Sequence, residues 1–435
     1  MSKTTFLGGA HLPYYKELSR EKQISVPRLP SEVIIPLKQH TGAPCEPLVQ
    51  PGDEVEAGQK IGVSENFISS TVHASVSGTV KALEDRHYIT GELVKSVIIK
   101  VEEDRQNVEF KQERDLHTVT KEEIIDTVKE AGIVGMGGAA FPTAVKLNIP
   151  PDSPVDTVLI NGCECEPYLT CDYRLMMEKS EQLIAAAKIL LKAADARKCY
   201  FCIEDNKEDV AGALKENIDD PRIDFLSLPT RYPQGAEKQL IYAVLGRSVP
   251  SGGLPFHVGT LVQNVATAFA LYEAVVYNKP LIERVVTVTG QNIKNTANML
   301  VKIGTPVQHL IQECGGIKKH PAKVIIGGPM TGFSQLELNV PVVKGSNGVV
   351  VLPHDVNEEE AYHPCIRCGK CVESCPMLLY PNYISVAAEK EDFEEANKWD
   401  VMDCIECGIC SYVCLSRRPN SELIKLAKSE VKAQG

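Results

Sequence analysis

The most constraining feature of this 435-residue chain is a pair of matching cysteine runs near its C-terminal end. In each run, three cysteines are separated from one another by two residues, and a fourth follows after three more residues. The first run is Cys365, Cys368, Cys371 and Cys375, and the second is Cys404, Cys407, Cys410 and Cys414. This spacing is typical of two [4Fe–4S] clusters, in which three thiolates surround one cube and the fourth ligates the other. We therefore predict crossed ligand sets: Cys365, Cys368, Cys371 and Cys414 for one cluster, and Cys375, Cys404, Cys407 and Cys410 for the other.

Structural zinc and disulfides are the alternative uses of so many cysteines. Zinc sites usually take two Cys-x-x-Cys pairs for each metal rather than triplets of this kind. Disulfides form mainly in extracellular chains, and residues 1–5 lack the basic start and apolar run of a secretory signal. Iron–sulfur clusters are therefore the favoured interpretation.

Apolar spacing between the two runs predicts a helical cluster domain. Residues 383–390 and 392–399 each place apolar side chains three and four positions apart, as in short helices. We expect this domain to span residues 351–435. Its single tryptophan, Trp399, is predicted to pack rather than to take part in chemistry.

Composition limits the cell compartments and the classes of partner that we expect for the protein. No run of about eighteen or more uncharged apolar residues is present, so no transmembrane helix is expected. The formal net charge of −11 argues against nucleic acid as a partner, because phosphate binding needs a concentrated basic patch. Together with unpaired cysteines, these features predict a cytoplasmic protein.

The sequence pattern of residues 1–115 predicts a β domain. Residues 33–101 contain short β-type runs interrupted by glycine, with hairpins over 49–62 and 72–80. This pattern resembles the barrel-sandwich fold of biotinyl and lipoyl domains. The expected hairpin tip at 66–69 has no lysine to carry a swinging cofactor, so a scaffold or docking role is predicted.

A charged connector at 102–115 leads to alternating helices and buried strands in residues 116–280. The apolar spacing predicts helices at 121–132 and 175–194, and strands at 155–160 and 199–203. Such alternation favours a mainly parallel, Rossmann-like sheet covered by helices, with ligands at the carboxyl ends of the strands.

Residues 281–350 predict strands around one helix at 306–314, which indicates a small β-grasp-like domain. The expected fold class is therefore multidomain α/β plus β. Its order is a barrel sandwich, a Rossmann-like domain, a β-grasp domain and a helical domain with two [4Fe–4S] clusters.

Two segments of the Rossmann-like region carry candidate binding residues. Glycines in the loop 132–146 allow backbone amides to approach a phosphate closely, and Lys146 can add a positive charge. The loop matches neither the dinucleotide fingerprint nor a P-loop, so a tight packing loop is the alternative. The segment 161–168 follows a predicted strand, and its amide and carboxylates can hydrogen-bond a flavin ring edge or ribityl and ribose hydroxyls.

These two segments, together with several others along the chain, resemble known proteins. The sequences GMGGAAFPTAVK (135–146), NGCECEP (161–167), YPQGAE (232–237) and VQNVAT (262–267) are similar to the FMN- and NADH-binding subunit of respiratory complex I. With GGAHLP (8–13), QHTGAPCEP (39–47), PSGGLP (250–255) and DCIECG (403–408), the chain resembles, nearly end to end, the C-subunit family of the Rnf complex. That family belongs to a membrane-bound ferredoxin:NAD⁺ oxidoreductase.

The resemblance implies non-covalent FMN in the Rossmann-like domain, NAD(H) stacked above it, and two [4Fe–4S] clusters that exchange electrons with the flavin. By motif position, nine residues would line FMN: Gly135, Gly137, Gly138, Lys146, Asn161, Glu164, Glu237, Asn264 and Thr267. Phe141, Glu166 and Phe256 would face the nucleotide. No catalytic side-chain acid or base is expected, because hydride passes directly between flavin and nicotinamide. Cys163 and Cys165 are predicted to pack rather than to form a redox disulfide.

Three functions follow as expectations. The first is the NAD(H)-reactive subunit of an Rnf-type ion-pumping complex, bound to a ferredoxin-accepting iron–sulfur subunit and membrane subunits on the inner face of the cell membrane. The alternative is a soluble relative that feeds a cytoplasmic reductase, such as an amino-acid reductase. The third is a relay or scaffold protein without nucleotide binding, against which the intact glycine loop and acidic segment argue.

Overall fold

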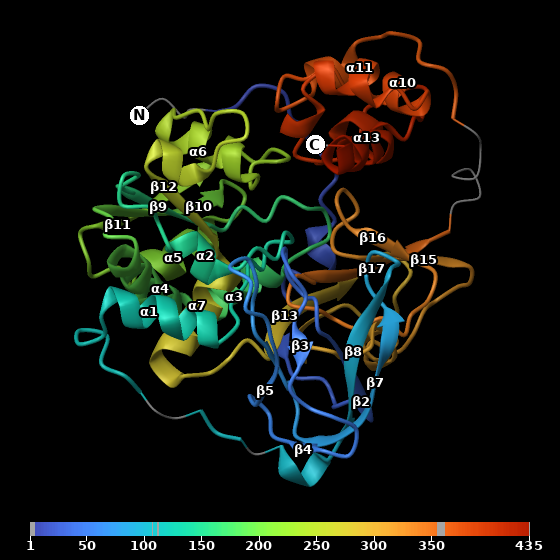
Figure 1. The fold of residues 1–435 in the computed structure, drawn as a ribbon. Coiled ribbons are helices and arrows are strands. Elements are labelled where there is room, and N and C mark those ends of the chain that lie inside the picture. Colours follow the sequence, from blue (N-terminus) through green and yellow to red (C-terminus); the bar gives the residue numbers. More distant parts are fainter. Residues whose placement is uncertain (1–4, 107, 111–112, 355–361, 435) are drawn as a thin grey trace.

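The computed structural model describes residues 5–106, 108–110, 113–354 and 362–434 (Figure 1). Parts of the predicted connector at 102–115 lie outside the described residues. The four predicted folds follow one another along the chain. Residues 5–25, called here the N-terminal segment, contact each of the later three domains. The exact boundaries at 115, 280 and 350 stay predictions.

The first domain is a barrel sandwich, as predicted. One antiparallel sheet has the order β2-β8-β7-β4, and a second has the order β3-β5-β6. Their bounds are β2 (Glu32–Pro36), β3 (Glu46–Pro47), β4 (Glu54–Val55), β5 (Lys60–Val63), β6 (Val72–His73), β7 (Gly78–His87) and β8 (Leu93–Val101). Val33, Ile35, Ile61, Val72 and Ile99 are among the side chains that fill the core between the sheets. Branched apolar residues on the inward face of such strands give this core its close packing.

The central domain contains a four-stranded sheet in which every pair of neighbours is parallel. Its order is β11 (Ile223–Leu228), β10 (Lys198–Glu204), β9 (Thr157–Asn161) and β12 (Thr260–Asn264). Helices α1 (Lys121–Glu130), α4 (Ser180–Ala193) and α7 (Val265–Tyr277) share the core on one face of the sheet, and α6 (Glu237–Leu245) packs on the other. The helices α2 (Thr143–Leu147) and α5 (Glu208–Lys215) complete the domain. The prediction of a mainly parallel sheet covered by helices is confirmed.

The predicted single helix at 175–194 is wrong. Two helices occupy this region, α3 (Cys171–Glu178) and α4, because Lys179 between them has non-helical backbone angles. The carboxylate of Glu178 accepts hydrogen bonds from the Ile24 amide and from Arg174. The end of α3 is therefore held against the N-terminal segment, a long-range contact that apolar spacing does not encode.

The third domain surrounds α8 (Val307–Glu313), close to the predicted helix. Its six-stranded sheet has the order β1-β14-β13-β17-β15-β16. Their bounds are β1 (Ile24–Ser25), β13 (Glu283–Thr289), β14 (Ala297–Lys302), β15 (Ala322–Ile326), β16 (Phe333–Gln335) and β17 (Gly348–Pro353). The edge strand β1 comes from the N-terminal segment and was not predicted.

The cluster domain is helical, as predicted. Its helices are α9 (Lys370–Glu373), α10 (Pro381–Glu389), α11 (Phe393–Lys398), α12 (Ile409–Tyr412) and α13 (Asn420–Gln434). Trp399 stacks on Tyr383 with ring centroids 4.7 Å apart, which confirms its packing role. Among the described residues, no helix has the length and apolar character needed to cross a bilayer.

Lys344 joins three domains through one buried ammonium group. Its Nζ donates hydrogen bonds of 2.7 Å to the carbonyls of Thr71 and Gly132. Burial lowers the pKa of Lys344 from its ordinary 10.5 to about 7. Between these two values the unfolded chain holds the extra proton, so the contribution of Lys344 to stability rises with pH.

We expect Lys344→Met to lose this dependence on pH. Between pH 7.5 and 9.5 the stability of the wild type should rise by about 1 kcal/mol per pH unit more than that of the variant. Urea midpoints measured across this range test the slope. The exposed Lys319→Met should keep the wild-type slope, and equal slopes in all three proteins would contradict the assignment.

Candidate functional site

The glycine loop is anchored at one side and open at the other. The Met136 amide donates a 2.8 Å hydrogen bond to Thr267 Oγ1 at the start of α7. Gly137 and Gly138 are exposed, and Gly138 has a φ of +124° that favours glycine. A Cβ added to Gly138 would have no neighbour within 4 Å, so the loop presents bare backbone to open space. Such open backbone would let a phosphate group approach the loop closely.

Two asparagines fix the strand ends beside this loop. Asn264 caps α7 by accepting from the Ala266 amide at 2.9 Å. Asn161 at the end of β9 donates to the Gly235 carbonyl at 2.8 Å. Because β9 and β12 are adjacent parallel strands, both asparagines lie at the same sheet edge. A Cβ on Gly137 would be 3.5 Å from the Cβ of Asn264, so the glycine loop lies directly against this edge.

Lys146 and Glu237 bring two further elements to the same place. Lys146 lies in α2, after the glycine loop, and forms an ion pair with Glu237, the first residue of α6. The printed contacts therefore join Gly137 to Asn264, the Met136 amide of the glycine loop to Thr267, Asn161 to Gly235, and Lys146 to Glu237, two residues after Gly235. Open glycines, one cation and several amide and carboxylate groups fit FMN; the glycine loop and Lys146 are the groups that would hold its phosphate.

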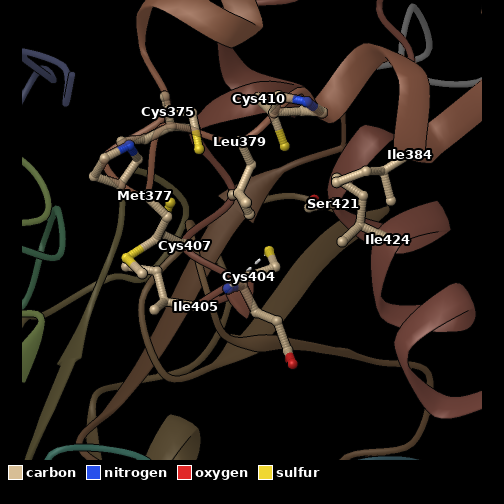
Figure 2. A pocket seen from close by; sticks show the side chains of 15 residues that line it. Cys375, Met377, Leu379, Ile384, Cys404, Ile405, Cys407, Cys410, Ser421 and Ile424 are labelled. Carbon is tan, nitrogen blue, oxygen red and sulfur yellow. Dashed lines mark hydrogen bonds between the residues drawn. The ribbon is translucent and has the colours of Figure 1, made fainter. Parts of the chain in front are cut away.

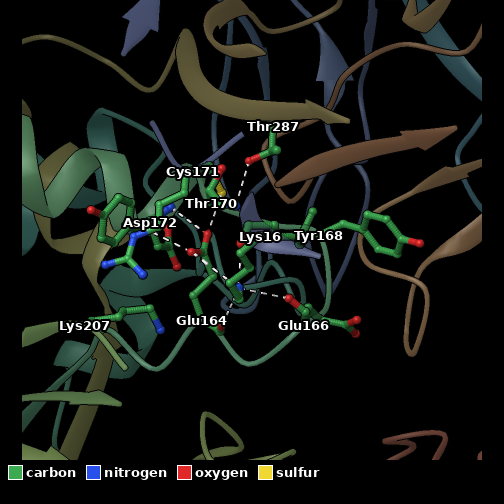
Figure 3. A network of polar contacts seen from close by, with 12 residues as sticks. Lys16, Glu164, Glu166, Tyr168, Thr170, Cys171, Asp172, Lys207 and Thr287 are labelled. Carbon is green, nitrogen blue, oxygen red and sulfur yellow. Dashed lines mark hydrogen bonds and ion pairs between the residues drawn. The ribbon is translucent and has the colours of Figure 1, made fainter. Parts of the chain in front are cut away.

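Glu164 lies in the acidic segment 161–168 and is only 7 % exposed (Figure 3). Its carboxylate accepts hydrogen bonds from the Asp172 amide at 2.8 Å and the Tyr173 amide at 3.3 Å, so it caps α3. Asp172 in turn accepts a 2.6 Å hydrogen bond from Asn264. Burial, followed by the negative charge of Glu164, raises the pKa of Asp172 well above its ordinary value. The two carboxylates link the acidic segment to the glycine-loop edge.

Lys16 was missed by sequence analysis. Its ammonium donates to the carbonyls of Glu164 at 2.6 Å, Glu166 at 3.1 Å and Leu169 at 2.6 Å, and it lies 3.8 Å from the Glu164 carboxylate (Figure 3). Burial lowers the pKa of Lys16, and the negative charge of Glu164 opposes this shift. One side chain from the N-terminal segment thus shapes the whole acidic loop.

The three residues expected at the nucleotide, Phe141, Glu166 and Phe256, have no hydrogen-bond partner in common among the described residues. Glu166 accepts hydrogen bonds from the Met330 amide at 3.1 Å and from Thr331 Oγ1, which ties the acidic loop to the β-grasp domain. Phe141 is half-buried within the glycine loop, and Phe256 lies in η3 (Pro255–Val258) with its ring against His257. Their contact with a nucleotide stays a prediction.

Cys163 and Cys165 lie in two different apolar clusters. Both thiols are buried, and burial raises the pKa of Cys165 to about 12. A protonated thiol is a poor nucleophile, so this environment favours the predicted packing role.

The cluster cysteines line two separate cavities in the crossed combination that their spacing predicts. Cys375, Cys404, Cys407 and Cys410 line the first of these, called here the inner cavity (Figure 2). Cys365, Cys368, Cys371 and Cys414 line the second, called the outer cavity. Four thiols around one cavity fit a [4Fe–4S] cube, and the two fourth ligands are exchanged between the runs.

The inner cavity is attached directly to the central domain. The Tyr232 hydroxyl, in the sequence motif 232–237 that also contains Glu237, donates a 2.7 Å hydrogen bond to the Cys407 carbonyl. Gln239 in α6 donates to the Pro376 carbonyl at 3.0 Å, and the Gly9 amide donates to the Ser374 carbonyl at 2.8 Å. The inner cavity is therefore hydrogen-bonded to the domain that carries the glycine loop.

Comparison with protein families divides the chain in the same way. Residues 4–104 match the RnfC barrel sandwich hybrid domain, and residues 128–273 match the Nuo51 FMN-binding domain. Residues 285–334 match the SLBB domain, and residues 358–415 match a 4Fe-4S dicluster domain. FMN and [4Fe–4S] clusters are thus the cofactors of this domain set.

Several curated relatives match over almost the whole chain. The C subunit of the proton-translocating ferredoxin:NAD⁺ oxidoreductase complex of Clostridium ljungdahlii is 44 % identical, over 99 % of this chain and 95 % of the relative. The C subunit of the Na⁺-translocating complex of Acetobacterium woodii is also 44 % identical, over 99 % and 98 %. The C subunit of an ion-translocating oxidoreductase complex of Rhodobacter capsulatus is 39 % identical, over 98 % and 82 %.

A solved structure shares the fold of a large part of the chain. The NAD⁺-reducing [NiFe]-hydrogenase in its air-oxidised state matches 72 % of this chain and 61 % of its own chain, with a TM-score of 0.50 and 18 % identity. At this identity the likeness concerns the fold alone.

Proposed function

Because the chain belongs to the C-subunit family of Rnf-type ferredoxin:NAD⁺ oxidoreductase complexes, we propose that it is the NAD(H)-reactive electron-transfer subunit of such a complex. It exchanges electrons between two [4Fe–4S] clusters, FMN and NAD(H). One observation carries the proposal: a four-cysteine cavity is hydrogen-bonded through Tyr232 to the domain that holds the glycine loop. The one-electron and two-electron sites are therefore neighbours in a single chain.

The cofactors perform the redox chemistry, and the protein sets their positions and surroundings. FMN, when bound, converts between hydride exchange with NAD(H) and single-electron exchange with the clusters. Gly135, Gly137 and Gly138 would offer backbone to its phosphate, and Lys146 would offer positive charge. Asn161, Glu237, Asn264 and Thr267 would hold its polar edges, with Glu164 behind them. Phe141, Glu166 and Phe256 are the residues proposed for NAD(H).

The partners proposed for this chain are the other subunits of an Rnf complex. The three relatives are all named as subunits of ion-translocating complexes, which supports a peripheral position on the inner face of the cell membrane. The alternative, a soluble dehydrogenase that feeds a cytoplasmic reductase, is not favoured by these relatives.

Anaerobic purification tests the proposal. We expect about eight iron atoms, about eight sulfides and about one FMN per chain. The purified protein should also oxidise NADH with ferricyanide as the electron acceptor. Zinc in the cysteine cavities, or a protein without flavin and without NADH oxidation, would contradict the proposal.

A further inference from the structure

The two cysteine cavities have the same local construction but different surroundings. Position by position, Ile409 of the second run corresponds to Lys370 of the first. Ile409 is 0 % exposed and packs in one apolar cluster with Leu12, Cys165 and Tyr232. A Cβ on Gly408 would lie 2.5 Å from the Met330 carbonyl oxygen, so the backbone there is also covered. The second run is docked inside the molecule.

Among the described residues, the first run is contacted by the N-terminal segment at its end, where the Gly9 amide donates to the Ser374 carbonyl, but a Cβ on Gly369, the counterpart of Gly408, would have no neighbour within 4 Å. Cys368 is exposed although it lines the outer cavity. Ile366 is 63 % exposed and Leu415 is 59 % exposed, whereas Ile405, the counterpart of Ile366, is half-buried. Cys368 and Ile366, which line the outer cavity, and Leu415, which follows the cavity residue Cys414, are therefore all exposed to solvent.

The charges around the two cavities differ in sign. The charged residues that line the outer cavity are Arg367, Lys370 and Arg418. Arg418 is buried and forms a 2.7 Å ion pair with Glu389, so Arg367 and Lys370 are the exposed basic residues. The charged residue that lines the inner cavity is Glu406, which forms a 2.8 Å ion pair with Lys428. Because the whole chain has a net charge of −11, a basic face around the outer cavity is a local departure from the overall charge.

We propose that this face, formed by Ile366, Arg367, Cys368, Lys370 and Leu415 and called here the outer cluster face, docks an acidic ferredoxin-like protein or domain. A small apolar centre with a basic rim suits a short-lived complex with an acidic partner, since opposite charges accelerate encounter without requiring a large interface. The inference rests on the proposed function, and it adds which cluster meets the partner and what charge the partner carries.

The internal contact of the second run supports this geometry. There, the position of Lys370 is an isoleucine that is buried against the central domain, next to the inner cavity. The two runs thus share one local construction. The second run packs against the central domain through Ile409, and the first run has Lys370 at the equivalent position. In the docked complex, one electron passes from the reduced carrier to the oxidised outer cluster, or in reverse, and no bond forms or breaks.

The experiment uses the anaerobic full-length protein and an acidic bacterial ferredoxin with two [4Fe–4S] clusters as the probe. The double variant R367E/K370E reverses the rim charge. The variant Leu415→Glu adds a negative charge at a residue that does not line the cavity, which keeps the test valid if the double variant loses its cluster. K319E/K432E is the matched control, with the same change in net charge at exposed positions away from both cavities.

Dissociation constants and rates of electron transfer are measured at low and high ionic strength. The wild type and the control should bind the ferredoxin, and binding should weaken with salt. R367E/K370E should bind about tenfold or more weakly and lose most of its salt dependence, and Leu415→Glu should change in the same direction. No saturable binding by the wild type, or equal binding by all four proteins, would overturn the proposal.

A separate measurement distinguishes failure of the docking face from failure of the proposed function. Wild-type clusters reduced chemically should be reoxidised by NAD⁺ without any ferredoxin. If that reaction occurs and ferredoxin binding does not depend on the rim charge, only the docking face is wrong. If NAD⁺ reoxidises nothing, the proposed function is wrong.

Discussion

Replacing Cys407 by alanine is expected to lower the iron content from about eight to about four atoms per chain and to disconnect the remaining cluster from NADH. Cys407 lines the inner cavity, and its carbonyl accepts the hydrogen bond from Tyr232 that attaches this cavity to the central domain. FMN should stay bound, and NADH should still bleach it. The electron paramagnetic resonance signal of the outer cluster should no longer appear after addition of NADH.

Cys314→Ala is the matched control for this variant. Cys314 is buried in the core of the β-grasp domain and lines neither cysteine cavity. The control should therefore keep about eight iron atoms. Loss of both clusters and of FMN in Cys407→Ala would contradict the separation of the two sites, since it would mean that the domains depend on one another for folding.

Lys16→Met is expected to cost about 3–5 kcal/mol of stability, because it removes one partner of a buried ion pair and leaves the other charge uncompensated. It also leaves the carbonyls of Glu164, Glu166 and Leu169 without their shared donor. Since Glu164 and Asp172 connect this loop to Asn264, the acidic segment should lose its fixed position. We expect weaker retention of FMN as well as a lower denaturation midpoint.

Two measurements check this prediction, the denaturant midpoint and the flavin-to-protein ratio after anaerobic gel filtration. Lys22→Met is the matched control in the same segment, because the Lys22 side chain is exposed, and its effect should stay within about 0.5 kcal/mol. If Lys16→Met retains FMN as fully as the control does, Lys16 does not position the flavin site.

The grouping of the eight cysteines around two cavities could be predicted from their local spacing, while their role as cluster ligands stays a prediction. Three thiolates that curl around one cube must be close in sequence, and the two cavities contain the predicted combinations. The parallel sheet and the helical cluster domain were predictable for a related reason, since apolar periodicity reports which face of each element is buried.

The role of the N-terminal segment could not be predicted, because it depends on contacts between distant parts of the chain. Lys16 and Glu164 are 148 positions apart, and no local pattern marks the lysine as buried. The same reason explains the missed strand β1, which pairs with β14, and the break between α3 and α4. Glu166 shows a further limit. The resemblance predicts that it faces the nucleotide, but its hydrogen bonds to Met330 and Thr331 appear only in the folded chain.

The most direct test of the account is a single-turnover reaction with NAD⁺ in the absence of any partner. The anaerobic protein is fully reduced by dithionite, freed of excess reductant and mixed with NAD⁺, and the NADH formed is measured. The account predicts about two NADH per chain, one from FMN and one from the electrons of both clusters, with loss of the cluster signals. Formation of about one NADH or none, with both clusters still reduced, would contradict the connection between the clusters and the NAD(H) site.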